Sequence, residues 1–119
     1  MGRLDLSNGV TGEGFFGVRG TSKTKGSKGP TAGVMGEHTA GDIGVWGTAM
    51  GGLGVVGDGA LGGVFSGTRA PVRLVPSKSK GSPTSGHHQI GELYADAVGE
   101  LFYCVADGTP GTWKMVKLV

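Results

Sequence analysis

Few residues of this chain have types and spacings that could do chemistry, and the glycines offer the first candidates. Two stretches match the dinucleotide-binding pattern G-x-G-x-x-G, Gly12–Gly17 and Gly52–Gly57. This pattern binds a pyrophosphate only where a strand precedes it and a helix follows, and no helical pattern follows either copy. The stretch Gly51–Val56 nearly fits a calcium-binding nonapeptide, but Val56 stands where the motif needs an acidic ligand. These matches therefore predict neither nucleotide nor calcium binding.

The adjacent histidines His87 and His88 are the candidates for a metal site. If three chains met on a threefold axis, one histidine per chain would supply three imidazoles, a set that suits a transition metal. Neighbouring residues on a strand point to opposite faces, so at most one of the pair could face the axis. The alternative is an ordinary histidine, exposed or hydrogen-bonded in a linker. The sequence requires no metal and no other cofactor.

The chain has no recognisable catalytic constellation. Its single cysteine, Cys104, lies within a predicted strand, where burial would make the thiol unreactive. No serine lies in a G-x-S-x-G elbow. The only acidic cluster, Glu92, Asp96, Glu100 and Asp107, is equally explained by surface solubility. We therefore predict that the protein is not an enzyme, and a hydrolase site built across subunits remains the alternative.

Two lysine-rich runs, 23–28 and 78–80, could contact phosphate or an anionic polysaccharide. Solvated loop charges are the usual explanation for such runs, and no aromatic residue is interleaved to stack a base. The net charge is only +2 and its lysines and arginines are scattered, so nucleic-acid binding is not expected.

The C-terminal aromatic residues are the better candidates for a contact surface. Tyr94, Tyr103 and Trp113 could stack on a sugar or anchor a protein partner. Strand alternation sends Phe102 and Tyr103 to opposite faces, so one of that pair should pack inside. The alternative is that all four aromatic side chains form the small core of this region.

The elements that would position these residues begin with a repeated phrase, Gly-Val-x-Gly. Its steps shorten from about 16 residues to about 10, and each copy is followed by a turn-like spacer. The copies are Gly17–Gly20, Gly33–Gly36, Gly44–Gly47 and Gly54–Gly57, with a degenerate copy at 63–65. A repeat this small cannot bury a hydrophobic face alone, so it needs neighbours.

The composition favours neighbours from other chains. Glycine supplies 27 of 119 residues, while 37% of residues are hydrophobic and 7% aromatic, so the core of a monomer would be thin. The regular apolar residues between the glycines argue against simple disorder. No apolar run approaches the length of about 18 residues that spans a bilayer, so membrane insertion is not expected.

Composition divides the chain into three predicted regions. Residues 1–67 form the glycine-rich repeat, interrupted at 21–31 by a predicted protruding loop. Residues 68–88 form a Pro/Ser/Lys linker with one short strand at 72–75, and residues 89–119 form a β-meander cap. The cap has predicted strands at 90–95, 101–105 and 113–118, punctuated by turns at 96–99 and 107–111.

We therefore predict an all-β protein whose repeats form an elongated homotrimeric shaft, a β-helix or β-prism of short strands. The valine of each copy would face the shared axis, and glycine would prevent crowding at the corners. A single-chain solenoid is the competing geometry. The predicted shaft core consists of Val18, Val34, Val45, Val55 and Val64.

The chain resembles the glycine-rich β-fibre proteins of bacteriophage tails and phage-derived bacterial genes. The resemblance rests on the Gly-Val-x-Gly copies and on the phrases at 71–76, 91–96 and 108–113. It implies a homotrimeric shaft with a small β-rich tip, located on a virion or outside the cell. The implied role is a structural tail fibre or spike, whose partners are other tail or fibre proteins and a host-surface polysaccharide. A bacterial surface adhesion or matrix protein of the same fold is the alternative.

Overall fold

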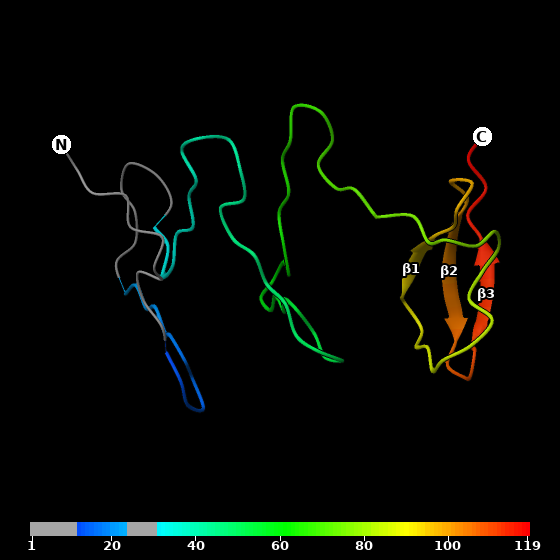
Figure 1. The fold of residues 1–119 in the computed structure, drawn as a ribbon, viewed down its shortest axis with the longest axis horizontal. Coiled ribbons are helices and arrows are strands. Elements are labelled where there is room, and N and C mark those ends of the chain that lie inside the picture. The colour runs from blue at the N-terminus through cyan, green and yellow to red at the C-terminus, as the bar shows by residue number, and fades with distance from the viewer. Residues whose placement is uncertain (1–11, 24–30) are drawn as a thin grey trace. The chain divides into compact units, whose positions relative to one another are not determined.

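The computed structural model describes residues 12–23 and 31–119. Strands are the only regular elements within these ranges, and they form one antiparallel sheet, β1-β2-β3 (Figure 1). Nothing in the described ranges forms a helix with the length and apolar character that crossing a bilayer demands. The chain divides into two units, Met1–Val56 and Gly57–Val119. Most of the predicted protruding loop, residues 24–30, lies outside the described residues.

In the first unit, the two glycines at the ends of each spacer lie with their backbones in direct contact, and we call this contact a glycine closure. Gly20 faces Gly33, and the same pairing joins Gly36 to Gly44 and Gly47 to Gly54. A Cβ added to any of these six glycines would lie within 2.9 Å of the partner's carbonyl oxygen. No side chain fits at that distance, so glycine is required at both ends of each spacer. The predicted spacer turns are confirmed at Thr39–Ala40 and Met50–Gly51.

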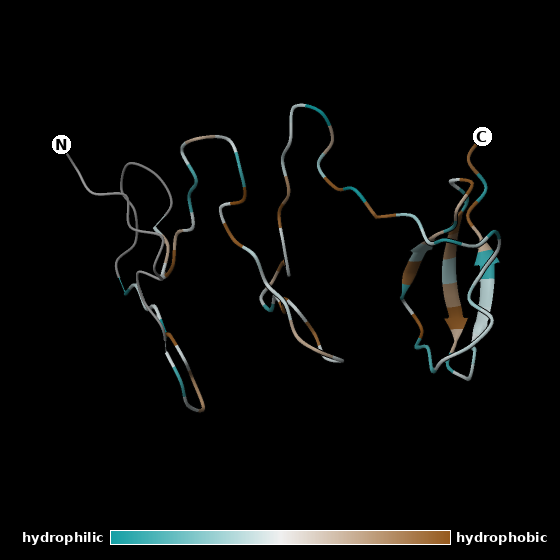
Figure 2. Cartoon of the chain, viewed as in Figure 1, coloured by the Kyte–Doolittle hydropathy of each residue, from teal (hydrophilic) through white to brown (hydrophobic). Residues whose placement is uncertain are grey.

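The repeat valines lie against these closures. A Cβ placed on the last glycine of a copy would lie within 2.4 Å of the Cγ2 atom of the valine in the next copy. The three pairs are Gly20 with Val34, Gly36 with Val45, and Gly47 with Val55. The other sides of these valines are uncovered, and Figure 2 shows hydrophobic residues recurring along this extended backbone. All five predicted core valines are between 69% and 82% exposed in the single chain.

The sheet lies in the second unit and consists of β1 (Leu93–Ala95), β2 (Leu101–Ala106) and β3 (Thr112–Met115). β1 pairs with β2 and β2 with β3, with a register shift between Cys104 and Ala106. The predicted meander is confirmed, although β1 begins at residue 93 and β3 ends at 115. Residues 89–92 form a turn in which Glu92 N–H donates to the Gln89 carbonyl and Gly91 has a φ of +97°. This turn stands where the first half of the predicted strand 90–95 was expected.

The two faces of the sheet differ in burial. Directly paired residues of an antiparallel sheet share a face, so Phe102, Cys104 and their partners Tyr94 and Trp113 lie on one side. Phe102 and Cys104 are buried there, whereas Tyr103 lies on the opposite face and is 39% exposed. The predicted burial of Cys104 and the predicted division between Phe102 and Tyr103 are confirmed.

The second half of the predicted linker, residues 77–88, is bonded to this sheet, and we call it the clamped segment. Ser77 N–H donates to the Ala95 carbonyl and Ala97 N–H to the Ser79 carbonyl. His88 and Gly108 exchange two backbone hydrogen bonds at 2.8 and 3.0 Å. Residues 72–75, by contrast, form no strand.

The buried carboxylate of Asp96 joins the clamped segment to the β1–β2 turn. Its Oδ2 accepts the Gly81 N–H at 2.8 Å, while Oδ1 accepts Val98 N–H at 3.1 Å and Glu100 N–H at 2.8 Å. Burial alone would raise the pKa of Asp96, but these backbone donors outweigh burial and hold the pKa below its usual range. A fully buried carboxylate therefore stays ionised and fixes two segments at once.

The glycine closures predict a contrast between two alanine substitutions. In Gly36→Ala the new Cβ would lie 2.1 Å from Val45 Cγ2 and 2.8 Å from the Gly44 carbonyl oxygen, so we expect a lower melting temperature. In Gly52→Ala the nearest atom is 3.5 Å away, so we expect no loss and a gain of up to about 1 kcal/mol. Thermal unfolding followed by circular dichroism compares the variants, and equal melting temperatures would contradict the closure.

The Asp96 contacts predict a selective effect of Asp96→Asn. The amide oxygen can stay with Val98 and Glu100, but an NH2 group then faces the Gly81 N–H, and two donors cannot bond to each other. We expect the Gly81 amide to exchange with deuterium at least about tenfold faster, while the amides of Val98 and Glu100 keep their protection. Hydrogen exchange followed by NMR measures all three, and a uniform loss of protection would contradict the assignment.

Candidate functional site

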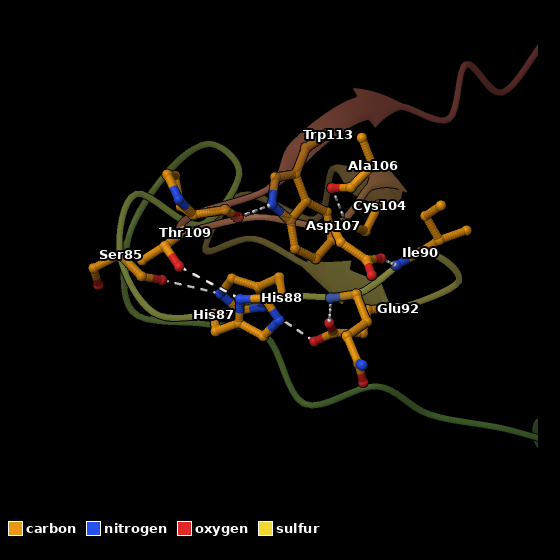
Figure 3. A network of polar contacts seen from close by, with 12 residues as sticks. Ser85, His87, His88, Ile90, Glu92, Cys104, Ala106, Asp107, Thr109 and Trp113 are labelled. Carbon is orange, nitrogen blue, oxygen red and sulfur yellow. Dashed lines mark hydrogen bonds and ion pairs between the residues drawn. The ribbon is translucent and has the colours of Figure 1, made fainter.

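His88 is the centre of the polar network shown in Figure 3. Its Nδ1 lies 3.0 Å from Glu92 Oε1, and its Nε2 lies 3.0 Å from the Ser85 carbonyl oxygen. Both partners are acceptors, so both ring nitrogens must carry a proton for the two bonds to form. The geometry therefore selects the charged imidazolium form of His88.

The electrostatics of this pair agree with the geometry. The hydrogen bond to Glu92 raises the pKa of His88, more than partial burial lowers it, and the Ser85 carbonyl adds to the rise. The pKa of Glu92 is lowered, first by the hydrogen bond from Gln89 N–H and then by His88. Each shift favours the charged form of its side chain, so the two shifts together widen the pH range over which His88 and Glu92 form an ion pair.

An aromatic group packs against this ion pair. The rings of His88 and Trp113 meet edge to face with centroids 5.2 Å apart, and Tyr94 lies 5.9 Å from Trp113. Trp113 Nε1–H donates to the Pro110 carbonyl at 2.9 Å, which orients the indole. Pro110 follows a cis peptide bond in the turn between β2 and β3. Indole, imidazolium and phenol rings thus form one row on the packed face of the sheet.

A cavity of about 360 Å³ opens beside this row. Tyr94 of β1 lines one part of the cavity, and His88 and six further residues of the clamped segment line the rest. These six residues are four with hydroxyl side chains, one lysine and one proline: Ser79, Ser82, Thr84, Ser85, Lys80 and Pro83. No carboxylate is among the lining residues. The cavity can therefore offer an aromatic surface, several hydroxyl groups and one ammonium to a ligand.

The three aromatic residues proposed as contact residues do not lie together. Tyr94 and Trp113 are half-buried on the packed face, and Tyr94 lines the cavity. Tyr103 lies on the other face, paired with Leu93 and Lys114. Of the three, Tyr94 is the residue placed to meet a ligand in this cavity.

The histidine candidates are engaged within their own chain. Both ring nitrogens of His88 have partners, and His87 Nδ1 lies 3.4 Å from Thr109 Oγ1. Within residues 12–23 and 31–119, no three His, Cys, Asp or Glu side chains are grouped so that they could hold a metal ion. A metal at His88 would have to displace Glu92 or the Ser85 carbonyl.

Three of the four clustered acidic residues bond to the backbone. Asp96 accepts three amides, Glu92 accepts Gln89 N–H, and Asp107 Oδ1 accepts Ile90 N–H at 2.7 Å. The cluster identified in the sequence thus fixes turns around the sheet.

Sequence reasoning missed the walls of the cavity. Residues 79–85 have the composition of a linker, and only the lysine run 78–80 was noted for its chemistry. The available signal was Asp96, which follows β1 directly. An acidic residue can fix a distant loop by accepting backbone N–H groups. The partner of Asp96 is Gly81, which is 15 residues away along the chain, so the sequence pattern around Asp96 does not identify it.

The ion pair predicts that the stability of the sheet depends on pH. The folded pKa of His88 is raised above 6.5. The charged His88 therefore contributes its full stabilisation of the folded state below pH 6.5, and this stabilisation is lost as pH rises through the raised pKa. The lowered pKa of Glu92 adds stability above about pH 4.5, which is lost as pH falls through its folded pKa. We expect Glu92→Gln to abolish the decline in melting temperature on the alkaline side and to lower the His88 pKa in an NMR titration. His87→Gln is the control and should keep the decline; an unchanged His88 pKa in Glu92→Gln would contradict the pairing.

Comparisons with protein-family models, with curated proteins and with solved structures found no match to this chain. The function is therefore inferred from the geometry of its own residues.

Proposed function

We propose that this protein is a structural fibre or spike of a phage or phage-derived particle, assembled as a homotrimer through its repeats. The observation that carries the proposal is the exposure of the repeat valines, each at least 69% accessible in the single chain. Regularly spaced apolar side chains that one chain leaves in water supply a surface for association with further copies.

The backbone of the repeat supports the same proposal. The described part of the repeat, residues 12–23 and 31–67, contains no strand. The repeat thus presents N–H and C=O groups that can pair with a neighbouring chain, as an edge strand does. Three copies would complete short strands between chains and cover the valines in the same step.

The glycine closures explain how three chains could approach one another. A closed spacer carries no side chain at its base, so neighbouring backbones can come near at these points. The valine that lies against each closure would then fill the space between chains. Trimeric assembly thus gives both glycines and the valine of the Gly-Val-x-Gly phrase a physical role.

The C-terminal sheet is proposed as the tip of the fibre, where it attaches to a host-surface glycan. Its hydrogen-bonded turns and clamped segment make it the more rigid part of the described chain. The row of Tyr94, Trp113 and His88 with the adjacent cavity is the part of the tip suited to a sugar.

The native mass of the full chain tests the trimer, and Val45→Asp tests the role of the repeat. We expect light scattering to give a mass of three chains for the wild type. We expect a single-chain mass for Val45→Asp, since assembly would bury an unpaired charge three times. Thr39→Asp, in a spacer turn of the same unit, is the matched control and should remain trimeric. A monomeric wild type, or a trimeric Val45→Asp, would contradict the proposal.

A further inference from the structure

The cavity beside Tyr94 lies entirely within the second unit and is bounded by residues 79–94. Its volume of about 360 Å³ is at the lower end of the range of about 300–1,000 Å³ found for small-molecule sites. A ligand of one or two rings is the size that such a cavity encloses. A longer polymer could place one unit in it and continue into solvent.

The walls of this cavity are held in place before any ligand arrives. At one end Asp96 Oδ2 accepts the Gly81 N–H, and at the other His88 Nε2–H donates to the Ser85 carbonyl. The three residues between these anchors, 82–84, thus form a short loop with both ends fixed. A fixed loop loses little conformational entropy on binding, which favours a specific site.

The chemistry of the lining suits a sugar ring. A pyranose has an apolar C–H face that packs on an aromatic ring, and hydroxyl groups around its edge. Tyr94 offers the aromatic ring, and Ser79, Ser82 and Thr84 offer hydroxyls that both donate and accept.

The charged residues of the lining indicate the charge of the ligand. The imidazolium of His88 is matched by Glu92, whereas Lys80 has no carboxylate beside it among the lining residues. A lysine in the lining of a cavity without carboxylates favours a ligand that carries a negative charge. Carboxylate is the anionic group that a sugar unit bears on its own carbon skeleton.

We propose that this cavity binds one unit of an acidic polysaccharide, with the sugar ring against Tyr94 and its carboxylate at Lys80. This inference rests on the proposed attachment role and names the class of glycan for it. It does not depend on the trimer, because all of the lining residues come from one chain.

The test uses the whole 119-residue chain and saturation-transfer NMR, with glucuronate and glucose as the observed ligands and inorganic phosphate as a competitor that displaces them. Glucuronate and glucose share the ring and differ in the carboxylate, whereas phosphate has charge without a ring. We expect the wild type to bind glucuronate about tenfold more tightly than glucose, the difference that a charged hydrogen bond provides. Lys80→Gln should reduce the affinity for glucuronate to that for glucose.

Lys78→Gln is the matched control, because Lys78 is exposed on the same segment and does not line the cavity. It should keep the preference for glucuronate. Equal losses in the two lysine variants, or phosphate competing as well as glucuronate, would overturn the inference and leave only nonspecific charge binding.

Other outcomes separate this inference from the proposed function. Equal binding of glucose and glucuronate to the wild type would overturn the acidic-sugar assignment but support attachment to glycans. A trimeric protein that binds neither sugar would overturn both the assignment and the attachment role, and would leave the structural fibre standing.

Discussion

The buried Asp96 carboxylate is the interaction on which the C-terminal unit depends. It follows β1 directly, shapes the turn into β2 and holds Gly81 of the clamped segment. Without the Gly81 contact, the segment that covers the packed face of the sheet would lose its central anchor. The cavity, the position of Ser85 and the environment of His88 all require that segment to stay in place, so one charge holds the sheet and the clamped segment together.

The sequence predicted the elements whose determinants are local. Alternating apolar residues and glycine-containing turns located the three strands, the burial of Cys104 and the division of Phe102 and Tyr103 between opposite faces. The strand bounds were less well predicted, because the turn at Gly91 replaces the expected first half of β1. The segment 72–75 was predicted as a strand but has no strand pairing in the structure, since strand formation requires a partner as well as β-branched residues.

The candidate site was predicted only in part, because its determinants are not local. Tyr94, Trp113 and His88 were identified as residues of interest, but their contact with one another follows from the sheet register and the pairing of His88 with Gly108. The hydroxyl-rich walls lie in a segment whose composition is that of a flexible linker. Backbone contacts to a single distant carboxylate fix that segment, and composition does not record such contacts.

The glycine closures have a consequence for how the repeat can change. Each loop is defined by the two glycines at its base, and the number of residues between them plays no part in that contact. The spacers bounded by Gly20 and Gly33 and by Gly47 and Gly54 differ in length, yet their bases close in the same way. Insertions and deletions can therefore accumulate in the spacers while the closing points are kept. In such a chain, new loops can be acquired and displayed without any redesign of the scaffold beneath them.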